Sequence, residues 1–153
     1  MNPTEVAKRY LSSGEVMQLG TLHGNYPRVV SVYYVATEYM NAAVIYWMSE
    51  PDKRHSIDLQ NSKRIGGAIV GKVDWPVAGL QFVGMGDLVE EKEELQRVID
   101  MYNAKYHDVA KGLFERIRNN TSKHRVYKLS IESLELFDEE HFPNDGIIDI
   151  PLG

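Results

Sequence analysis

The sequence contains no cysteine among its 153 residues. This absence excludes disulfides, thiolate catalysis and cysteine-ligated zinc or iron–sulfur sites. No apolar run approaches the ~20 residues that a membrane-spanning helix requires. The first residues, Met1-Asn2-Pro3-Thr4-Glu5, lack the basic and then apolar stretches of a secretory signal. We therefore expect a cytoplasmic protein without a membrane partner.

The chain is also short of positive charge. Its 17 lysines and arginines stand against 22 aspartates and glutamates, which gives a net charge of -5. Proteins that bind duplex nucleic acid usually carry a basic surplus, because they neutralise backbone phosphates. We therefore expect no nucleic-acid partner. A hydrophobic fraction of 43% and this length suit a single domain, residues 1–153, with a substantial core.

Several sequence motifs of common enzyme classes are missing as well. Gly84-Met85-Gly86 has no third glycine and opens no helix, so it is not a dinucleotide-binding loop. There is no Walker A loop and no Gly-x-Ser-x-Gly elbow. The five histidines show no metal-ligand spacing. The sequence therefore predicts no metal site and indicates no catalytic acid or base.

What the sequence does contain is a series of β-branched and aromatic segments of strand length. The expected strands span residues 16–22, 28–36, 43–49, 65–73, 79–89 and 125–137. A short turn joins the first two, which makes them an antiparallel hairpin. The apolar alternation of the last strand changes phase, so we expect a bulge near Glu132-Ser133. The pattern favours a mainly β (α+β) fold, a closed or nearly closed small barrel with helices inserted between strands.

Helices and turns are predicted from local signals. Asn2-Pro3-Thr4-Glu5 has the cap, proline and acid of a helix start, and Gly14 should end that helix. Amphipathic or capped segments predict helices over residues 50–61 and 90–106, and a short helix from Val109 to Ile117. A turn is expected at residues 39–41.

The most unusual segment runs from Ser49 to His55. Ser49 and Asp52 have the spacing of a capping box, which indicates a helix start. Three potential cations, Lys53-Arg54-His55, follow in the first turn, where the helix dipole favours anions instead. A phosphate bound to the free amides and the basic side chains would resolve this conflict. A solvated basic patch of small energetic cost explains the segment equally well.

Two further residues and a set of aromatics could add to such a site. Arg28 could bring a second guanidinium to the anion, or pair with a carboxylate at a strand edge. The Gln81 amide, on the strand face of Val83 and Met85, could meet the edge of a heteroaromatic ring or bond a neighbouring backbone group. Strand aromatics could line a flat-ring pocket, although such residues are more often ordinary core. These aromatics are Tyr33, Tyr34, Tyr46, Trp47 and Trp75.

The order and spacing of these segments resemble the FMN-binding split barrels of the pyridoxamine 5'-phosphate oxidase-like superfamily. The resemblance covers most of residues 5–137, and the Lys53-Arg54-His55 version is most similar to a small bacterial branch. It implies a six-stranded antiparallel split β-barrel with flanking helices, and a homodimer with FMN at the subunit interface. The matching pieces are Leu19-Gly20-Thr21-Leu22, Gly24-Asn25-Tyr26-Pro27, Arg28-Val29-Val30-Ser31-Val32, Val44-Ile45-Tyr46-Trp47-Met48-Ser49, Asp52-Lys53-Arg54-His55, Asn61-Ser62-Lys63-Arg64-Ile65, Gly79-Leu80-Gln81-Phe82-Val83-Gly84 and Val126-Tyr127-Lys128-Leu129.

The resemblance also implies roles for individual residues. Positions around the FMN phosphate are matched by Arg28, Lys53, Arg54 and His55. Ser49 matches a contact to the phosphate or the flavin, and Met48 matches the backbone position beside the isoalloxazine. Ser31 and Tyr33 lie on the strand that lines the flavin, and Gln81 matches the glutamine at the ring edge. His55 replaces the family's usual lysine, which weakens the phosphate contact above the pH at which the imidazole titrates.

The chain departs from the true oxidases at its C-terminus. It lacks their Arg-x-His pair and ends with Phe142-Pro143-Asn144-Asp145-Gly146 and an apolar tail, so we do not expect pyridoxamine phosphate oxidation. The leading hypothesis is an FMN-dependent oxidoreductase of unknown substrate that uses a nicotinamide or another reductant.

Two alternatives remain open. The first is a non-catalytic storage or sensor protein for flavin or haem, because split barrels of this type also hold haem or a deazaflavin. Its candidate axial ligands are His23, His55 and His141. The second is a barrel that has lost cofactor binding and acts only as a dimeric scaffold.

Overall fold

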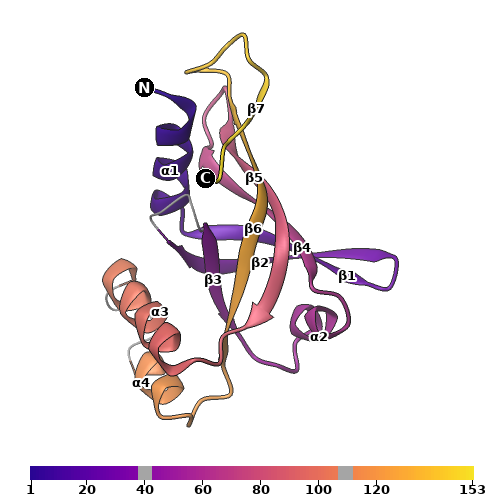
Figure 1. The fold of residues 1–153 in the computed structure, drawn as a ribbon, viewed down its shortest axis with the longest axis vertical. Coiled ribbons are helices and arrows are strands. Elements are labelled where there is room, and N and C mark those ends of the chain that lie inside the picture. The colour runs from indigo at the N-terminus through magenta and orange to yellow at the C-terminus, as the bar shows by residue number, and fades with distance from the viewer. Residues whose placement is uncertain (38–42, 107–111) are drawn as a thin grey trace.

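The computed structural model describes residues 1–37, 43–106 and 112–153 (Figure 1). The turn expected at residues 39–41, and Val109 of the expected short helix, lie outside this part of the chain. The described elements are α1 (Pro3–Ser13), β1 (Val16–His23), β2 (Tyr26–Ala36), β3 (Val44–Ser49), α2 (Arg54–Asn61), β4 (Arg64–Lys72), β5 (Ala78–Leu88), α3 (Lys92–Lys105), α4 (Leu113–Arg118), β6 (Arg125–Asp138) and β7 (Ile147–Asp149).

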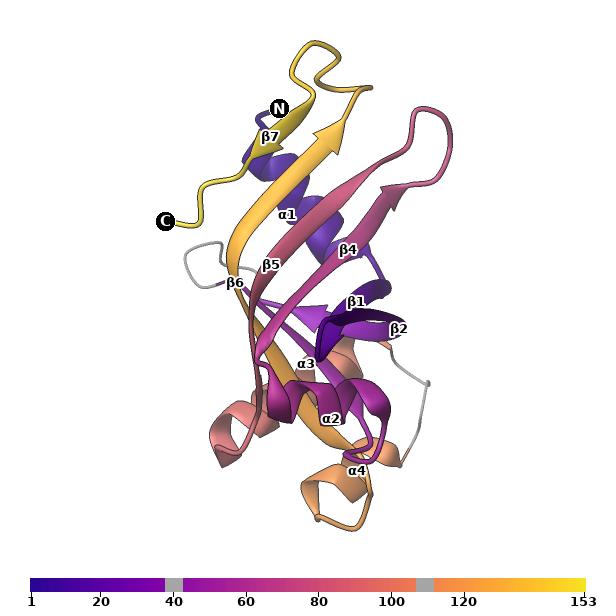
Figure 2. The same cartoon turned by 90° about the vertical axis from the view of Figure 1, so that its right-hand side faces the viewer.

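Six antiparallel strands close into a barrel. Their order is β3-β2-β1-β4-β5-β6, and β6 pairs back with β3 to complete the ring, while β7 adds to β6 outside it. Figures 1 and 2 show β4, β5 and β6 as long strands, with α1 beside their upper half and α2, α3 and α4 around the lower half. The expected six-stranded antiparallel barrel with flanking helices is confirmed.

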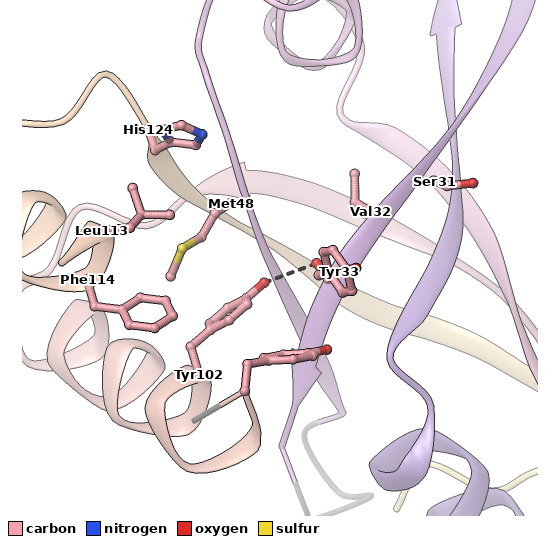
Figure 3. A pocket seen from close by; sticks show the side chains of 9 residues that line it. Ser31, Val32, Tyr33, Met48, Tyr102, Leu113, Phe114 and His124 are labelled. Atoms are coloured by element: carbon pink, nitrogen blue, oxygen red, sulfur yellow. Dashed lines mark hydrogen bonds between the residues drawn. The ribbon is translucent and has the colours of Figure 1, made fainter. Parts of the chain in front are cut away.

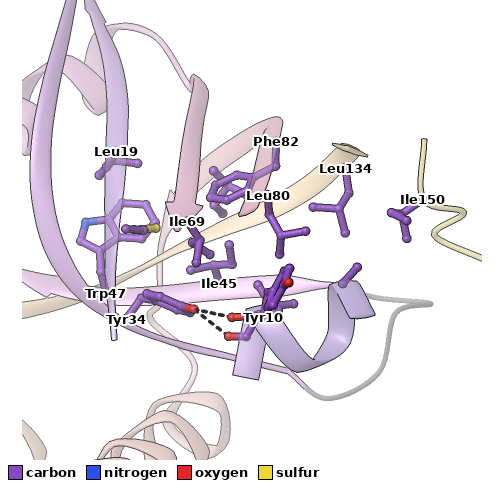
Figure 4. Packing of buried hydrophobic residues seen from close by; sticks show 14 of the residues in the cluster. Tyr10, Leu19, Tyr34, Ile45, Trp47, Ile69, Leu80, Phe82, Leu134 and Ile150 are labelled. Atoms are coloured by element: carbon purple, nitrogen blue, oxygen red, sulfur yellow. Dashed lines mark hydrogen bonds between the residues drawn. The ribbon is translucent and has the colours of Figure 1, made fainter. Parts of the chain in front are cut away.

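The barrel interior follows the two-residue period of its strands. Every second residue of β1 is buried, beginning with Met17, so one face of the strand points into the core. Figure 4 shows Leu19, Trp47 and Leu80 in this core, and the Tyr34 hydroxyl donates to the Leu11 carbonyl at 2.7 Å. That hydrogen bond anchors α1 against the barrel.

A second apolar cluster lies under α3 and α4 and packs them against β2, β3 and β6. Its buried members include Tyr46, Val98, Ile99, Tyr102 and Val126. The described helices include none whose length and apolarity would suit a membrane crossing.

Two local predictions are confirmed by the structure. Asn2 caps α1: its side-chain oxygen accepts from the Glu5 amide at 2.9 Å, and the Glu5 carboxylate accepts from the Asn2 amide. In β6, Ser133 pairs with Val83 and Ile131 pairs with Gly84, so Glu132 is the extra residue of a bulge. Both features depend on neighbours in the sequence, and this is why they could be predicted.

The expected start of the second helix is wrong. We expected a helix from residue 50 capped by Ser49 and Asp52, but α2 begins at Arg54, with Lys53 as a cap residue that makes no side-chain hydrogen bond. The chain turns first, because the Lys53 amide donates to the Glu50 carbonyl at 3.2 Å. Ser49 ends β3 instead, and its hydroxyl bonds His55.

Candidate functional site

The cations at the start of α2 meet Arg28 at one pocket, which we call the basic pocket. It has a volume of about 490 Å³. Strands β1 and β2 form one wall and the start of α2 forms the other. The residues that line it are Thr21, Arg28, Val29, Val30, Lys53, Arg54 and His55. The structure thus brings together the four residues expected around a phosphate.

The first turn of α2 adds backbone donors to these side chains. Helical hydrogen bonding begins where the Ile57 amide donates to the Lys53 carbonyl at 3.0 Å, so the amides of residues 54–56 are the donors of the first turn that lack a helical acceptor. The Ser56 hydroxyl, only 2% exposed, has no partner among the described residues. Unsatisfied donors and adjacent cations make this end of α2 suited to an anion.

Asp58, one turn into α2, forms an ion pair with Arg28. Its carboxylate is 1% exposed, accepts a hydrogen bond from Thr21 Oγ1 at 2.9 Å and lies 3.5 Å from Arg28 Nε. His23 Nδ1 lies 3.1 Å from its other oxygen. A buried carboxylate requires such partners. Sequence reasoning missed Asp58, because its partners Arg28, Thr21 and His23 lie on other elements and meet it only through tertiary packing.

His55 is held by Ser49. The Ser49 hydroxyl lies 2.6 Å from His55 Nε2. Burial lowers the pKa of His55, with a further lowering by the Lys53 charge and an opposing effect of Asp58. The imidazole is therefore neutral at neutral pH and can meet an anion only as a hydrogen-bond donor. Ser49 is not among the residues that line the basic pocket; it acts on the pocket through His55.

A second cavity, which we call the aromatic cavity, opens farther along β2 (Figure 3). Its volume is about 300 Å³. The residues that line it are Ser31, Val32, Tyr33, Met48, Tyr102, Tyr106, Leu113, Phe114 and His124. Ser31, Tyr33 and Met48 were expected near a flavin ring. The residues of α3 and α4, and His124, were missed because helix packing on β2 is a tertiary relationship.

The two cavities share strand β2. Arg28 lies in the basic pocket and Tyr33 in the aromatic cavity, and the strand rise places five residues roughly 17 Å apart. A long molecule with a charged end and a flat end could therefore follow this strand. Of the five aromatics considered as a ring pocket, Tyr33 alone lines the cavity. Tyr34, Tyr46 and Trp47 are buried, and Trp75 is 88% exposed on the β4–β5 loop.

Gln81 lies away from both cavities. Its amide donates to the Glu135 carboxylate at 3.1 Å on the neighbouring strand, rather than to a backbone group. Pairing from Ser31 through Gln18 and Ala68 reaches Gln81 across four strands. Three strand spacings amount to roughly 14 Å, so a single chain does not bring Gln81 to the other candidate residues.

The outer face of the sheet beside Gln81 carries exposed valines. One row of paired residues runs from Val29 through Gly20 and Gly66 to Val83. Val29 is 72% exposed and Val83 is 54% exposed. A contiguous apolar face of this kind is typical of a protein–protein interface.

Comparisons with known proteins agree with this fold. The family described as "Pyridoxamine 5'-phosphate oxidase" matches residues 3–138. Among curated proteins, none matches the chain.

Many solved structures share the fold. A protein of unknown function from Agrobacterium tumefaciens is 19% identical with a TM-score of 0.69; the match covers 88% of this chain and 55% of that one, so this chain spans about half of its length. A FAD-binding protein from Mesorhizobium loti is 16% identical with a TM-score of 0.65, and the match covers 88% and 92%. A haem storage protein from Vibrio cholerae is 17% identical with a TM-score of 0.69, and the match covers 88% and 94%. At such identities the likeness shows the fold alone.

Proposed function

Because the chain belongs to the pyridoxamine 5'-phosphate oxidase family, we propose that it binds FMN and acts as an FMN-dependent oxidoreductase. The observation that carries this proposal is the basic pocket: Arg28, Lys53, Arg54 and the unsatisfied first turn of α2 surround one pocket. A phosphate monoester matches that set of donors, because charged hydrogen bonds and the helix dipole act in the same direction.

The remaining parts of FMN fit the path along β2. In this proposal the ribityl chain follows the outer face of β2 from the basic pocket. The flavin ring then lies against Ser31, Tyr33 and the backbone of Met48, at the mouth of the aromatic cavity. The flavin supplies the redox chemistry when bound, and this chain's residues bind it, orient it and exclude water. Arg28 contributes from a fixed position, because Asp58 holds its Nε.

We further propose that two copies assemble through the flat outer face of β1, β2, β4 and β5. This arrangement is supported by the exposed valines of that face and by the glycines between them, which let another chain approach closely. It would also give Gln81 a role, because Gln81 of the partner subunit could reach the ring edge that this chain's own Gln81 does not approach. The proposed protein is a homodimer with FMN at its interface.

Haem is the second candidate cofactor, favoured by one observation. Three histidines are held by partners within the chain: His23 by Asp58, His55 by Ser49 and His141 by Asp138. His124, whose Nδ1 lies 3.3 Å from Ser122 Oγ, lines the aromatic cavity, where its other ring nitrogen could serve as an axial ligand. Sequence reasoning had considered the first three and not His124. The visible spectrum separates the two cofactors, because haem gives a Soret band.

Replacement of Arg54 tests the phosphate assignment. Arg54→Ala should weaken FMN binding about tenfold to a hundredfold, since a hydrogen bond to a charged group contributes roughly 1.5–3 kcal/mol. Arg9→Ala, which removes an exposed arginine from α1, is the matched control and should leave the affinity unchanged. Quenching of FMN fluorescence during titration measures both constants. An Arg54→Ala protein with unaltered FMN affinity would show that the phosphate does not bind in the basic pocket.

A further inference from the structure

Four aromatic rings line the aromatic cavity as a connected chain. Tyr33 meets Tyr106 edge-on with ring centroids 5.6 Å apart. Tyr106 lies 5.5 Å from Tyr102, and Tyr102 lies 5.8 Å from Phe114. Figure 3 shows the Met48 sulfur and Leu113 near the ring of Phe114. Aromatic and thioether surfaces of this kind favour contact with another flat ring.

The hydroxyls of Tyr102 and Tyr106 are already used by the fold. Tyr102 donates to the carbonyl of Tyr33 at 3.1 Å and to that of Tyr46 at 3.2 Å. Tyr106 donates to the carbonyl of Tyr34 at 2.5 Å. Burial raises the pKa of Tyr106 to about 12 and that of Tyr102 well above its ordinary value, so both stay neutral. A ligand therefore meets mainly the ring surfaces of these residues.

The cavity also lacks a charge to pair with an ion. No lysine, arginine, aspartate or glutamate is among the described residues that line it. Lys105, from the same helix as Tyr102, bonds the carbonyls of Gly14 and Tyr34. A charged ligand group would therefore find no opposite charge among these described lining residues, and burying it unpaired is unfavourable. The polar groups of the lining include the hydroxyls of Ser31 and Tyr33 and the His124 imidazole, whose Nδ1 lies 3.3 Å from Ser122 Oγ.

We infer that the aromatic cavity binds an uncharged, planar aromatic compound of one or two rings, with one polar group directed to His124. A volume of about 300 Å³ suits this size. The ligand class follows from the lining residues. The further step, that this compound is the organic reactant of the flavin, rests on the proposed function. A phosphorylated substrate fits poorly, because the described lining residues offer no cation to its phosphate.

Benzamide and benzoate test this inference directly, because they share one ring and differ in charge. Isothermal titration of the full chain, with and without FMN, should give a benzamide affinity at least about tenfold higher than that of benzoate. Benzamide should not displace FMN. Benzoate binding as tightly as benzamide, or displacement of FMN by benzamide, would overturn the inference; displacement would mean that the flavin ring itself occupies the cavity.

Variants of Leu113 test whether the probe binds in the aromatic cavity. Leu113 is the first residue of α4 and is partly exposed, so a longer side chain can be accommodated there. Leu113→Trp should fill the cavity and weaken benzamide binding about tenfold, and Leu113→Lys should reverse the preference toward benzoate. Asn119→Lys adds the same charge at the exposed end of α4 and should change neither. Unaltered ligand binding in both Leu113 variants would place the ligand elsewhere.

The same titrations keep this inference separate from the FMN proposal. A protein that retains no FMN but shows the benzamide preference and the Leu113 effects would contradict the proposed cofactor and support the ligand class. A protein that retains FMN but binds neither probe at millimolar concentration would contradict the ligand class alone.

Discussion

Arg28 and Asp58 form an ion pair between β2 and α2, with Nε 3.5 Å from a carboxylate oxygen that is nearly inaccessible to solvent. The pair connects the strand that carries both cavities to the helix that carries the other cations. Because Asp58 also accepts from Thr21 and lies beside His23, its carboxylate has polar partners on three side chains. The position of Arg28 in the basic pocket therefore depends on Asp58, which does not line that pocket.

Neutralising Asp58 should reduce the stability of the protein itself. In Asp58→Asn the free energy of unfolding should fall by about 2 kcal/mol, since hydrogen bonds to a charged group contribute roughly 1.5–3 kcal/mol. Urea denaturation of the FMN-free protein measures this free energy of unfolding. Thr21→Val, which removes one neutral hydrogen bond to the same carboxylate, should cost about 1 kcal/mol. Equal losses in the two variants would mean that the charge of Asp58 contributes nothing.

His55 should make the stability depend on pH. Burial lowers its pKa below the ordinary value near 6.5, so at pH values between the two the unfolded chain binds more protons than the folded one. Its contribution to stability is therefore fully present above about pH 6.5 and decreases as the pH falls toward the lowered pKa. His55→Gln, which can still bond Ser49, should lose this component.

The measurement is urea denaturation of both proteins at about pH 8 and at about pH 5.5, on either side of the ordinary histidine pKa. Carboxylates titrate in both proteins, so the difference between them isolates His55. A wild-type protein and a His55→Gln variant that lose the same stability over this range would contradict the assignment.

Gln81 should affect the flavin ring more than FMN affinity. In Gln81→Ala we expect a shifted flavin spectrum or reduction potential, with an FMN dissociation constant changed by less than about threefold, because phosphate contacts dominate the affinity. Glu135→Gln, which alters the Gln81 partner on β6 while keeping the amide, is the control. A large loss of FMN affinity without a spectral change would contradict the ring-edge role.

The outer sheet face should carry the dimer. Val83→Glu places a charge at the β5 end of the row from Val29 to Val83 and should convert the dimer to a folded monomer, because an unpaired charge is disfavoured in an interface. Val73→Glu, at a more exposed position on the β4–β5 loop, should leave the assembly intact. Light scattering after size exclusion gives both masses. A Val83→Glu protein that remains dimeric would place the interface on another surface.

The parts of the fold that the sequence predicts are those specified by local periodicity. Strands such as β1 alternate between core and surface at every residue, and the Asn2 cap lies three residues from Glu5, so both can be identified without tertiary information. The start of α2 could not be placed in this way. Ser49 had the capping spacing, but β3 extends through Ser49 and a turn at residues 50–53 separates it from the helix.

The same distinction applies to the candidate site: some of its residues can be chosen from sequence patterns, and others are found only from the tertiary structure. Arg28, Lys53 and Arg54 could be chosen from the sequence because their charges conflict with the surrounding pattern. Phe114 and His124 could not, because α4 and the segment before β6 reach the aromatic cavity only through packing against β2 and β3. Their types are ordinary in a core or a loop, so their role becomes visible only when the tertiary structure brings them together.

The visible absorption spectrum of the purified protein, recorded before and after incubation with FMN and removal of excess cofactor, tests the central claim most directly. The proposed function predicts retained flavin bands, with the released cofactor identified as FMN at about one per chain. A Soret band, or a colourless protein that retains no added FMN, would contradict it.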